Sequence, residues 1–326
     1  MILFTIYGII QFLQGKIYYA HVPPVPISGL YYVNKIHFSL LPIFVFYDYS
    51  RKGIITEVFM RKYLIVFFIV ITIGAIFHMF EVQEQMGNDE VTNNFGYTYL
   101  SFIPMLLYLP PKSKKQIFLW SISLVMILLC MKRGAIIISL IVTSIYCLYL
   151  FRKSSGFAKR RLVFGFILFI LLGLFIINKL ASSSDYFNER IERTIDGDSS
   201  GRDTYYLFFV DYYLNQTTQQ DFLFGMGANA TLGIWDNYAH NDWLEIAINQ
   251  GLLGIIIYIY FWICFFITCK GNSMVPHIKV VLWMIFVIYF MQTLFSMSYR
   301  EYTLYSSMAL GFSLAMINMR RSKSIR

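Results

Sequence analysis

Long apolar runs recur along nearly the whole chain of 326 residues. A helix needs roughly 20 mostly apolar residues to cross a hydrocarbon core of about 30 Å, and about 17 residues lie near the lower limit. Polar backbone groups inside that core must pair within the segment, so each run is expected to be helical. The sequence therefore predicts an all-α, polytopic integral membrane protein with about ten transmembrane helices. The predicted spans are residues 1–13, 36–47, 63–80, 94–110, 117–131, 134–151, 162–180, 251–269, 280–297 and 302–319.

The composition supports this fold class. Hydrophobic residues make up 57% of the chain and charged residues only 14%, which does not fit the surface of a soluble globular protein. The chain opens on MILFTIYGII, without a basic region or a small-residue cleavage site. The first run is therefore expected to remain as a helix rather than to be a removed signal peptide. Residues 1–326 are expected to form a single polytopic membrane domain.

Lysine and arginine are distributed unevenly between the two sides of the predicted bundle. Alternate connections and the C-terminal tail hold 18 of the 27 Lys and Arg residues, with only two acids. The positive-inside rule assigns these segments to the cytoplasm, so both termini are expected there and nucleic acid is not an expected partner. The basic segments are residues 48–62, 111–116, 152–161, 270–279 and 320–326.

The longest connection, residues 181–250, falls on the outer (periplasmic) side and is expected to contain short helices and the chemistry. Within it, SSGRDTYYLFFVDYYLN predicts an aromatic helix with Arg202 at its start. An arginine there can grip a pyrophosphate, because guanidinium matches phosphate oxygens and a helix N-terminus adds unpaired N–H groups. A solvated or salt-bridged arginine is the commoner outcome, especially with Asp198 and Asp203 nearby.

The outer turn MKRG breaks the charge pattern, because it places Lys132 and Arg133 where few positive charges are expected. Side chains that extend to the lipid headgroups explain such a pair, and this is the favoured interpretation for Lys132. For Arg133, which begins a predicted helix, a role in anion binding is an equal alternative.

The stretch YAHNDWLEIAINQGLLG joins the outer loop to the next span. Asp242 followed by Glu245 fits the capping pattern of a helix start, with Asp242 as the capping residue. Capping does not account for His240. Its imidazole can act as a general base near neutral pH, but from the residues alone an ordinary interfacial histidine is the favoured interpretation.

These motifs, in this order, resemble the bacterial O-antigen polymerase and O-antigen ligase superfamily. The resemblance rests on RGA from Arg133, SGRD before the aromatic helix, GMG, and the block HNDWLEIAINQGLLG, and it spans roughly residues 94–320. It implies an enzyme in the bacterial inner membrane that transfers glycans from undecaprenyl pyrophosphate on the outer face.

Carried over by position, the resemblance implies catalytic roles for Arg202 and His240. Arg133, Arg300 and Asn241 are expected to contact the substrate. The implied reaction is an inverting glycosyl transfer that needs no metal or other cofactor. Expected partners are an undecaprenyl-pyrophosphate-linked oligosaccharide, membrane lipid and a chain-length-regulating membrane protein.

The sequence leaves three functions as alternatives. A polymerase, which is preferred, and a ligase that transfers glycan to the lipid A core share these motifs and differ in acceptor. A small-solute transporter is the third, but its ionisable groups would be expected near the bilayer midplane. The outer-loop aromatic residues can stack on sugars, while an aromatic belt or core packing explains most of them. They are Tyr205, Tyr206, Tyr212, Tyr213, Trp235, Tyr238 and Trp243.

Overall fold

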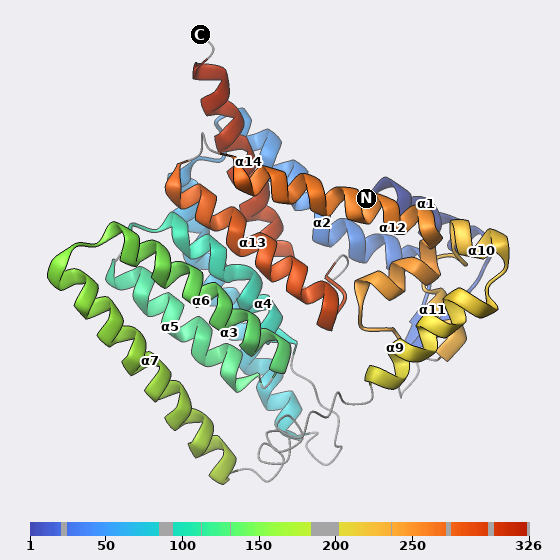
Figure 1. Cartoon of the computed structure of the whole chain (residues 1–326), viewed down its shortest axis with the longest axis horizontal. Coiled ribbons are helices and arrows are strands. Elements are labelled where there is room, and N and C mark those ends of the chain that lie inside the picture. The colour runs from blue at the N-terminus through green and yellow to red at the C-terminus, as the bar shows by residue number, and fades with distance from the viewer. Residues whose placement is uncertain are drawn as a thin grey trace. The chain divides into compact units, whose positions relative to one another are not determined.

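A computed structural model shows a chain that is helical nearly throughout (Figure 1). It describes residues 1–20, 25–84, 94–111, 113–130, 132–183, 202–235, 237–271, 275–298 and 303–324. The longer helices are α1 (Ile2–Leu13), α2 (Gly29–Arg51), α3 (Glu57–Glu84), α4 (Phe95–Phe102), α5 (Lys114–Leu129), α6 (Arg133–Lys153), α7 (Gly156–Ser183), α9 (Arg202–Asp211), α12 (Asp242–Lys270), α13 (Pro276–Phe295) and α14 (Leu304–Ser324). Shorter elements are the 3₁₀ helix η1 (Ile103–Tyr108), the π-helix η2 (Tyr212–Gln216), α10 (Gln219–Phe224), α11 (Ala230–Trp235) and the antiparallel strands β1 (Tyr18–Ala20) and β2 (Val25–Ile27).

Every predicted span overlaps a helix, but the count of ten spans stays a prediction. Four helices in the described ranges are long and apolar enough to cross a membrane, and they lie at Glu57–His78, Arg133–Lys153, Asp242–Lys270 and Pro276–Leu294. The length of the helices explains part of the difference between the ten predicted spans and these four helices. At 1.5 Å per residue, the 12 residues of α1 extend about 18 Å, which is well short of the hydrocarbon core.

Two compact units make up the chain. The first contains Met1–Phe67, Ser101–Pro111 and Arg202–Arg326, and the second contains Phe68–Leu100 and Lys112–Gly201. The predicted single domain is not tested by this division, and each unit is described by itself below.

In the second unit, α5, α6 and α7 lie side by side (Figure 1). The rings of Trp120 and Tyr146 stack with their centroids 4.2 Å apart, and the Tyr146 hydroxyl donates to Gln116 Oε1 at 2.6 Å. Gly96 of α4 lies close to Cys130 and Ala135, where a Cβ atom would lie 3.2 Å and 3.4 Å from theirs. These contacts fix α4 beside the turn from which α6 begins at Arg133.

In the first unit, aromatic rings hold α12 against α13. Trp262 of α12 contacts Phe286 and Phe290 of α13 edge-on, with centroids 5.4 and 5.2 Å apart. Phe266 packs in the same way against Trp283 at 5.7 Å. Each such pair contributes about 0.5–1.5 kcal/mol beyond the area that it buries, so this half of α12 is firmly positioned.

Helix α12 is broken at Gly251, which has a left-handed φ of 65°. The break separates residues 242–250, which the sequence assigns to the outer loop, from the predicted span that follows. It frees carbonyl groups that an unbroken helix would pair. The N–H groups of Met226 and Gly227 replace those partners, donating to Ile248 and Asn249 at 2.9 and 3.1 Å.

Two glycines make this arrangement possible. A Cβ atom on Gly251 would lie 2.5 Å from the Gly225 nitrogen and 2.7 Å from the Leu223 carbonyl carbon. A Cβ atom on Gly225 would collide with the Asn249 carbonyl oxygen. Both residues also have φ angles that favour glycine, so the loop after α10 can lie directly against the broken helix.

We expect Gly251→Ala to lower the free energy of unfolding by about 1–3 kcal/mol, because it adds backbone strain and a collision at the break. Thermal and denaturant unfolding of the purified protein in detergent would measure this. Gly165→Ala is the matched control, since Gly165 has an ordinary helical φ and open space around its Cβ position. Equal stability of the two variants would contradict the role of the break.

Candidate functional site

Arg202 is the first residue of α9, as the sequence predicts. Tyr206, Phe209 and Tyr213 follow it at spacings of three or four residues and therefore share its side of the helix. Phe209 and Tyr213 are buried, so this side packs into the first unit. Arg202 itself, at the start of the helix, is partly exposed.

The hydroxyl of Tyr206 links α9 to two other segments. It lies 3.0 Å from the carbonyl oxygen of Leu294, near the end of α13, and 3.3 Å from that of His240. Burial raises the pKa of Tyr206, and the positive charge of Arg202 and a hydrogen bond with the Asn241 side chain partly oppose that rise. Tyr206 therefore keeps its proton at neutral pH and donates it, with Arg202 close enough to act on it electrostatically.

His240 lies in a turn that is held by contacts on both sides. Its backbone is left-handed, with φ of 50°, which is uncommon for a residue other than glycine although histidine tolerates it better than most. The preceding N–H group, of Ala239, donates to Glu245 Oε1 at 2.6 Å. The following residue, Asn241, caps α12 by accepting from the N–H groups of Trp243 and Leu244 at 2.9 and 3.3 Å. The half-buried imidazole thus projects from a fixed backbone.

The prediction that Asp242 caps α12 was wrong. Asn241, not Asp242, is the capping residue, and Asp242 and Glu245 are both fully buried. Asp242 accepts hydrogen bonds from the hydroxyls of Tyr258, at 2.7 Å, and Ser298. The two carboxylates therefore make tertiary contacts, whereas a capping role would leave them near solvent.

Glu245 is the centre of a buried polar network. Besides Ala239, it accepts from Thr231 Oγ1 and Asn249 Nδ2, both at 3.0 Å. Asn249 Oδ1 in turn accepts from the N–H group of Ala230 at 2.8 Å. Because a buried carboxylate is costly unless it is hydrogen-bonded, these donors fix α11, the His240 turn and the first half of α12 together.

Three of the five predicted site residues come together in the first unit. All three lie close to Tyr206: the Arg202 charge and the Asn241 side chain act on its hydroxyl, and the carbonyl oxygen of His240 lies 3.3 Å from that hydroxyl. Arg133 begins α6, as predicted, and its side chain is half-buried. It belongs to the second unit, whereas the other three belong to the first. Arg300 lies outside the described residues. The assignment of all five as site residues stays a prediction.

A cavity of about 380 Å³ lies farther along α9 and η2, in the same unit. Tyr18 of β1 and Tyr212 of η2 are among its walls, and Gln216 adds an amide. Gly233 makes room, because a Cβ atom there would lie 2.6 Å from Tyr18 Cε1. The lining residues are Tyr18, Phe208, Tyr212, Gln216, Met226, Ala230, Gly233 and Ile234.

This cavity distinguishes among the aromatic residues of the outer loop. Tyr213 and Tyr238 are buried in the core, and Trp243 Nε1 donates to Thr293 at 3.0 Å. Trp235 packs on Phe208 at 4.3 Å between centroids. Tyr212 alone among the seven predicted candidates lines the cavity.

Sequence reasoning missed three residues that build the site. The sequence indicates Tyr206 only as a ring that can stack on sugars, although its spacing of four residues from Arg202 places both on one side of a helix. Tyr18 lies in a hairpin far away in sequence, and nothing in its local pattern points to the outer loop. Glu245 was assigned to capping because that local pattern was the simplest available.

We expect Glu245→Ala to lower the free energy of unfolding by at least about 3 kcal/mol, because it leaves three buried donors without their acceptor. Unfolding of the detergent-purified protein measures the change. Glu57→Ala is the control, since Glu57 pairs with Arg61 at the surface and is worth at most about 1 kcal/mol. A loss from Glu245→Ala no larger than the control's would contradict the proposed network.

Comparison with known families adds an independent finding. Residues 118–259 match the family model described as O-Antigen ligase. No curated protein matches the chain. The matched range includes Arg133, Arg202 and His240, and members of the family are glycosyltransferase-like enzymes. Together with the apolar helices, the match indicates a multi-pass membrane protein. The resemblance to the O-antigen polymerase and ligase superfamily is therefore confirmed, over residues 118–259.

Proposed function

We propose that the chain is an O-antigen polymerase, which joins undecaprenyl-pyrophosphate-linked repeat units on the outer face of the bacterial inner membrane. The observation that carries the proposal is that the Arg202 charge acts on Tyr206, while the His240 carbonyl oxygen lies 3.3 Å from the hydroxyl of the same tyrosine. The guanidinium of Arg202 brings a permanent positive charge, and the imidazole of His240 can accept a proton. On this proposal both termini lie in the cytoplasm and residues 181–250 face outward.

The proposed reaction is a direct displacement at the anomeric carbon of the growing chain. A hydroxyl oxygen of the acceptor repeat unit attacks that carbon while its proton passes to the His240 imidazole. The bond from the anomeric carbon to the pyrophosphate oxygen breaks, and the lipid pyrophosphate leaves with the electron pair. Attack from the opposite face inverts the configuration.

Arg202 stabilises the charge that develops on the leaving group. Its guanidinium can pair with two phosphate oxygens at once, and the N-terminus of α9 adds N–H groups that an anion can accept from. Since these groups supply positive charge at the leaving oxygen, the proposed step needs no metal ion. Arg133 and Arg300 are proposed as further contacts of the pyrophosphate, and Asn241 as a contact of the sugar.

The fixed turn at His240 supports a catalytic role over a role as an interfacial side chain. A left-handed non-glycine residue costs free energy and persists where surrounding contacts determine it. Here Glu245, Asn241 and Tyr206 hold the residues around it. Such positioning is what a general base needs in order to reach one particular hydroxyl.

The cavity between Tyr18 and Tyr212 is proposed as a subsite for a sugar more distant from the reacting bond. Tyr212 lies ten residues beyond Arg202, which is about 15 Å along a helix. Aromatic walls and a single amide, Gln216, suit a sugar ring, which has an apolar face and hydroxyl groups at its edge. The π-helical turn that presents Tyr212 is a feature often found at functional sites.

A ligase is the second candidate, because the matching family model carries that description. The same Arg202 and His240 would then serve a sugar hydroxyl of the lipid A core. A transporter is disfavoured by the break in α12. Broken membrane helices of transporters present free carbonyl groups to ions, whereas Ile248 and Asn249 have theirs paired with Met226 and Gly227.

We expect Arg202→Ala and His240→Asn each to reduce polymer formation at least about a hundredfold. Asparagine also tolerates a left-handed backbone, so His240→Asn removes the imidazole without straining the turn. The assay incubates the purified protein with a defined undecaprenyl-pyrophosphate repeat unit and resolves the ladder of products.

Arg152→Ala and His37→Ala are matched controls, which should leave the ladder unchanged. All four variants should accumulate and unfold like the parent protein. Full ladders from both site variants would reject the assignment of the site. A parent protein that makes no ladder, but transfers the glycan when lipid A core is supplied, would favour the ligase.

Tyr212→Ala is expected to raise the KM for the repeat unit by up to about tenfold, because one ring contact of about 0.5–1.5 kcal/mol is lost. The kcat should change little, since Tyr212 is distant from the reacting bond. Leu214→Ala, in the same π-helical turn and exposed, is the control. An unchanged KM, or an equal effect of both variants, would remove this subsite from the proposal.

A further inference from the structure

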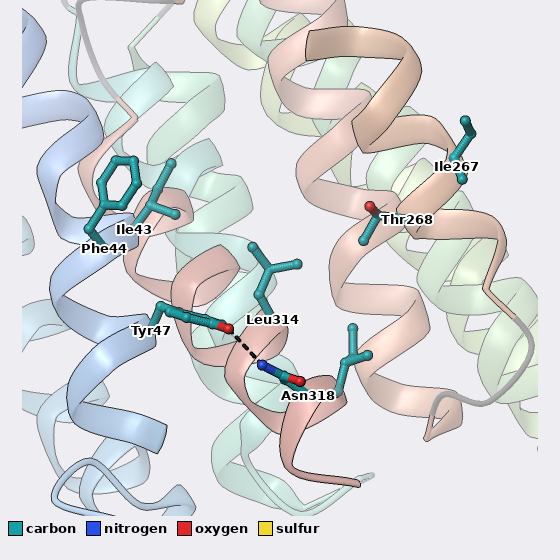
Figure 2. A pocket seen from close by; sticks show the side chains of 8 residues that line it. Ile43, Phe44, Tyr47, Ile267, Thr268, Leu314 and Asn318 are labelled. Atoms are coloured by element: carbon teal, nitrogen blue, oxygen red, sulfur yellow. Dashed lines mark hydrogen bonds between the residues drawn. The ribbon is translucent and has the colours of Figure 1, made fainter. Parts of the chain in front are cut away.

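A larger cavity, of about 540 Å³, lies near the last residues of α12, at the opposite end of that helix from the His240 turn. Figure 2 shows the side chains that line it. Three helices of the first unit, α2, α12 and α14, supply its walls. The residues that line it are Ile43, Phe44, Tyr47, Ile267, Thr268, Leu314, Ile317 and Asn318. None of these residues takes part in the proposed glycosyl transfer.

The crossing of α2 and α14 explains where the cavity begins and ends. At Gly311 the two helices touch, because a Cβ atom there would collide with the carbonyl oxygen of Ile43. Leu314 and Asn318 lie about one and two turns farther along α14 on a similar side. There Asn318 Nδ2 donates to the Tyr47 hydroxyl at 2.7 Å, which links α14 to α2 a second time, as the dashed line in Figure 2 shows.

The lining has an apolar part and a polar part. Its apolar side chains provide surface for a hydrocarbon chain, and two of them, Phe44 and Ile267, are 55% and 63% exposed. They are Ile43, Phe44, Ile267, Leu314 and Ile317. The polar groups are the Tyr47 hydroxyl, the Asn318 amide and the Thr268 hydroxyl. An occupant that matches this lining has an acyl chain joined to a polar head.

Three cations lie at or near the ends of the helices that form the cavity. The guanidinium of Arg51 lies 5.6 Å from the centroid of the Tyr47 ring. Lys270, the last residue of α12, lies over the neighbouring Phe266 ring at 4.6 Å. Arg320 follows Asn318 by two residues and is exposed. The nearby acid, Asp48, is paired with Lys52, so these three positive charges favour an anionic head.

We propose that this cavity binds one anionic phospholipid from the cytoplasmic leaflet. The acyl chain lies between α2, α12 and α14, and the phosphate faces Arg51, Lys270 and Arg320. Basic pockets between membrane helices on the cytoplasmic side recognise anionic headgroups in this way. The binding holds the ends of three helices together and is independent of the proposed glycosyl transfer.

Native mass spectrometry of the delipidated protein tests the selectivity of the headgroup. Dioleoyl phosphatidylglycerol and dioleoyl phosphatidylcholine, which share their acyl chains, are added in equal amounts. We expect phosphatidylglycerol to bind preferentially, and the double variant Arg51→Gln/Lys270→Gln to reduce that preference by about fivefold per cation. Arg152→Gln/Lys153→Gln removes the same charge elsewhere, with Lys153 likewise over a tyrosine ring, and should have no effect.

A second pair of variants locates the acyl chain. Ile267→Trp fills the cavity from an exposed position and should reduce binding of both lipids, whereas Ile263→Trp, one turn earlier and also exposed, should not. Equal binding of the two lipids by the parent protein would overturn the proposal. Equal effects within either pair of variants would also overturn it, because the lipid would then lie elsewhere.

Discussion

The break in α12 at Gly251 is the constraint on which the rest of the first unit depends. A helix that bends away in an apolar environment leaves carbonyl groups that must find donors within the protein. Met226 and Gly227 supply them, and they can do so only because Gly225 and Gly251 let two backbones touch. One local requirement of hydrogen bonding thus determines where the loop after α10 runs.

The position of that loop also determines the structure around the candidate site. Once the loop is fixed against α12, α11 lies beside the first half of that helix, where Thr231 and Ala230 reach Glu245 and Asn249. Glu245 then holds the N–H group of Ala239 and so sets the turn of His240. The exposed part of the site is small, but a continuous buried network positions it. The same network places hydrogen-bonding groups where an ordinary membrane helix would have apolar side chains.

The two ends of α12 differ in chemistry. At its start, Asn241 caps a segment that carries the buried polar side chains of Asp242, Glu245, Asn249 and Gln250 before the break. At its end, Ile267 and Thr268 line a largely apolar cavity, and Lys270 is the last residue of the helix. This division follows the uneven charge of the sequence, in which acids gather in one set of connections and lysines in the other. The proposed glycan chemistry and the proposed lipid site lie at opposite ends for that reason.

Hydropathy and motif order were enough to predict an all-α membrane protein, helices that overlap all ten predicted spans, the starts of α6 and α9, and the superfamily. These are properties of short stretches, because the length of an apolar run and the type of residue at a helix start are local. The contact of Gly225 with Gly251, the burial of Asp242 and Glu245, and the meeting of Arg202 with His240 at Tyr206 were decided by tertiary structure alone. Each joins residues distant in sequence, and a carboxylate that caps a helix looks the same in sequence as one that anchors a buried network.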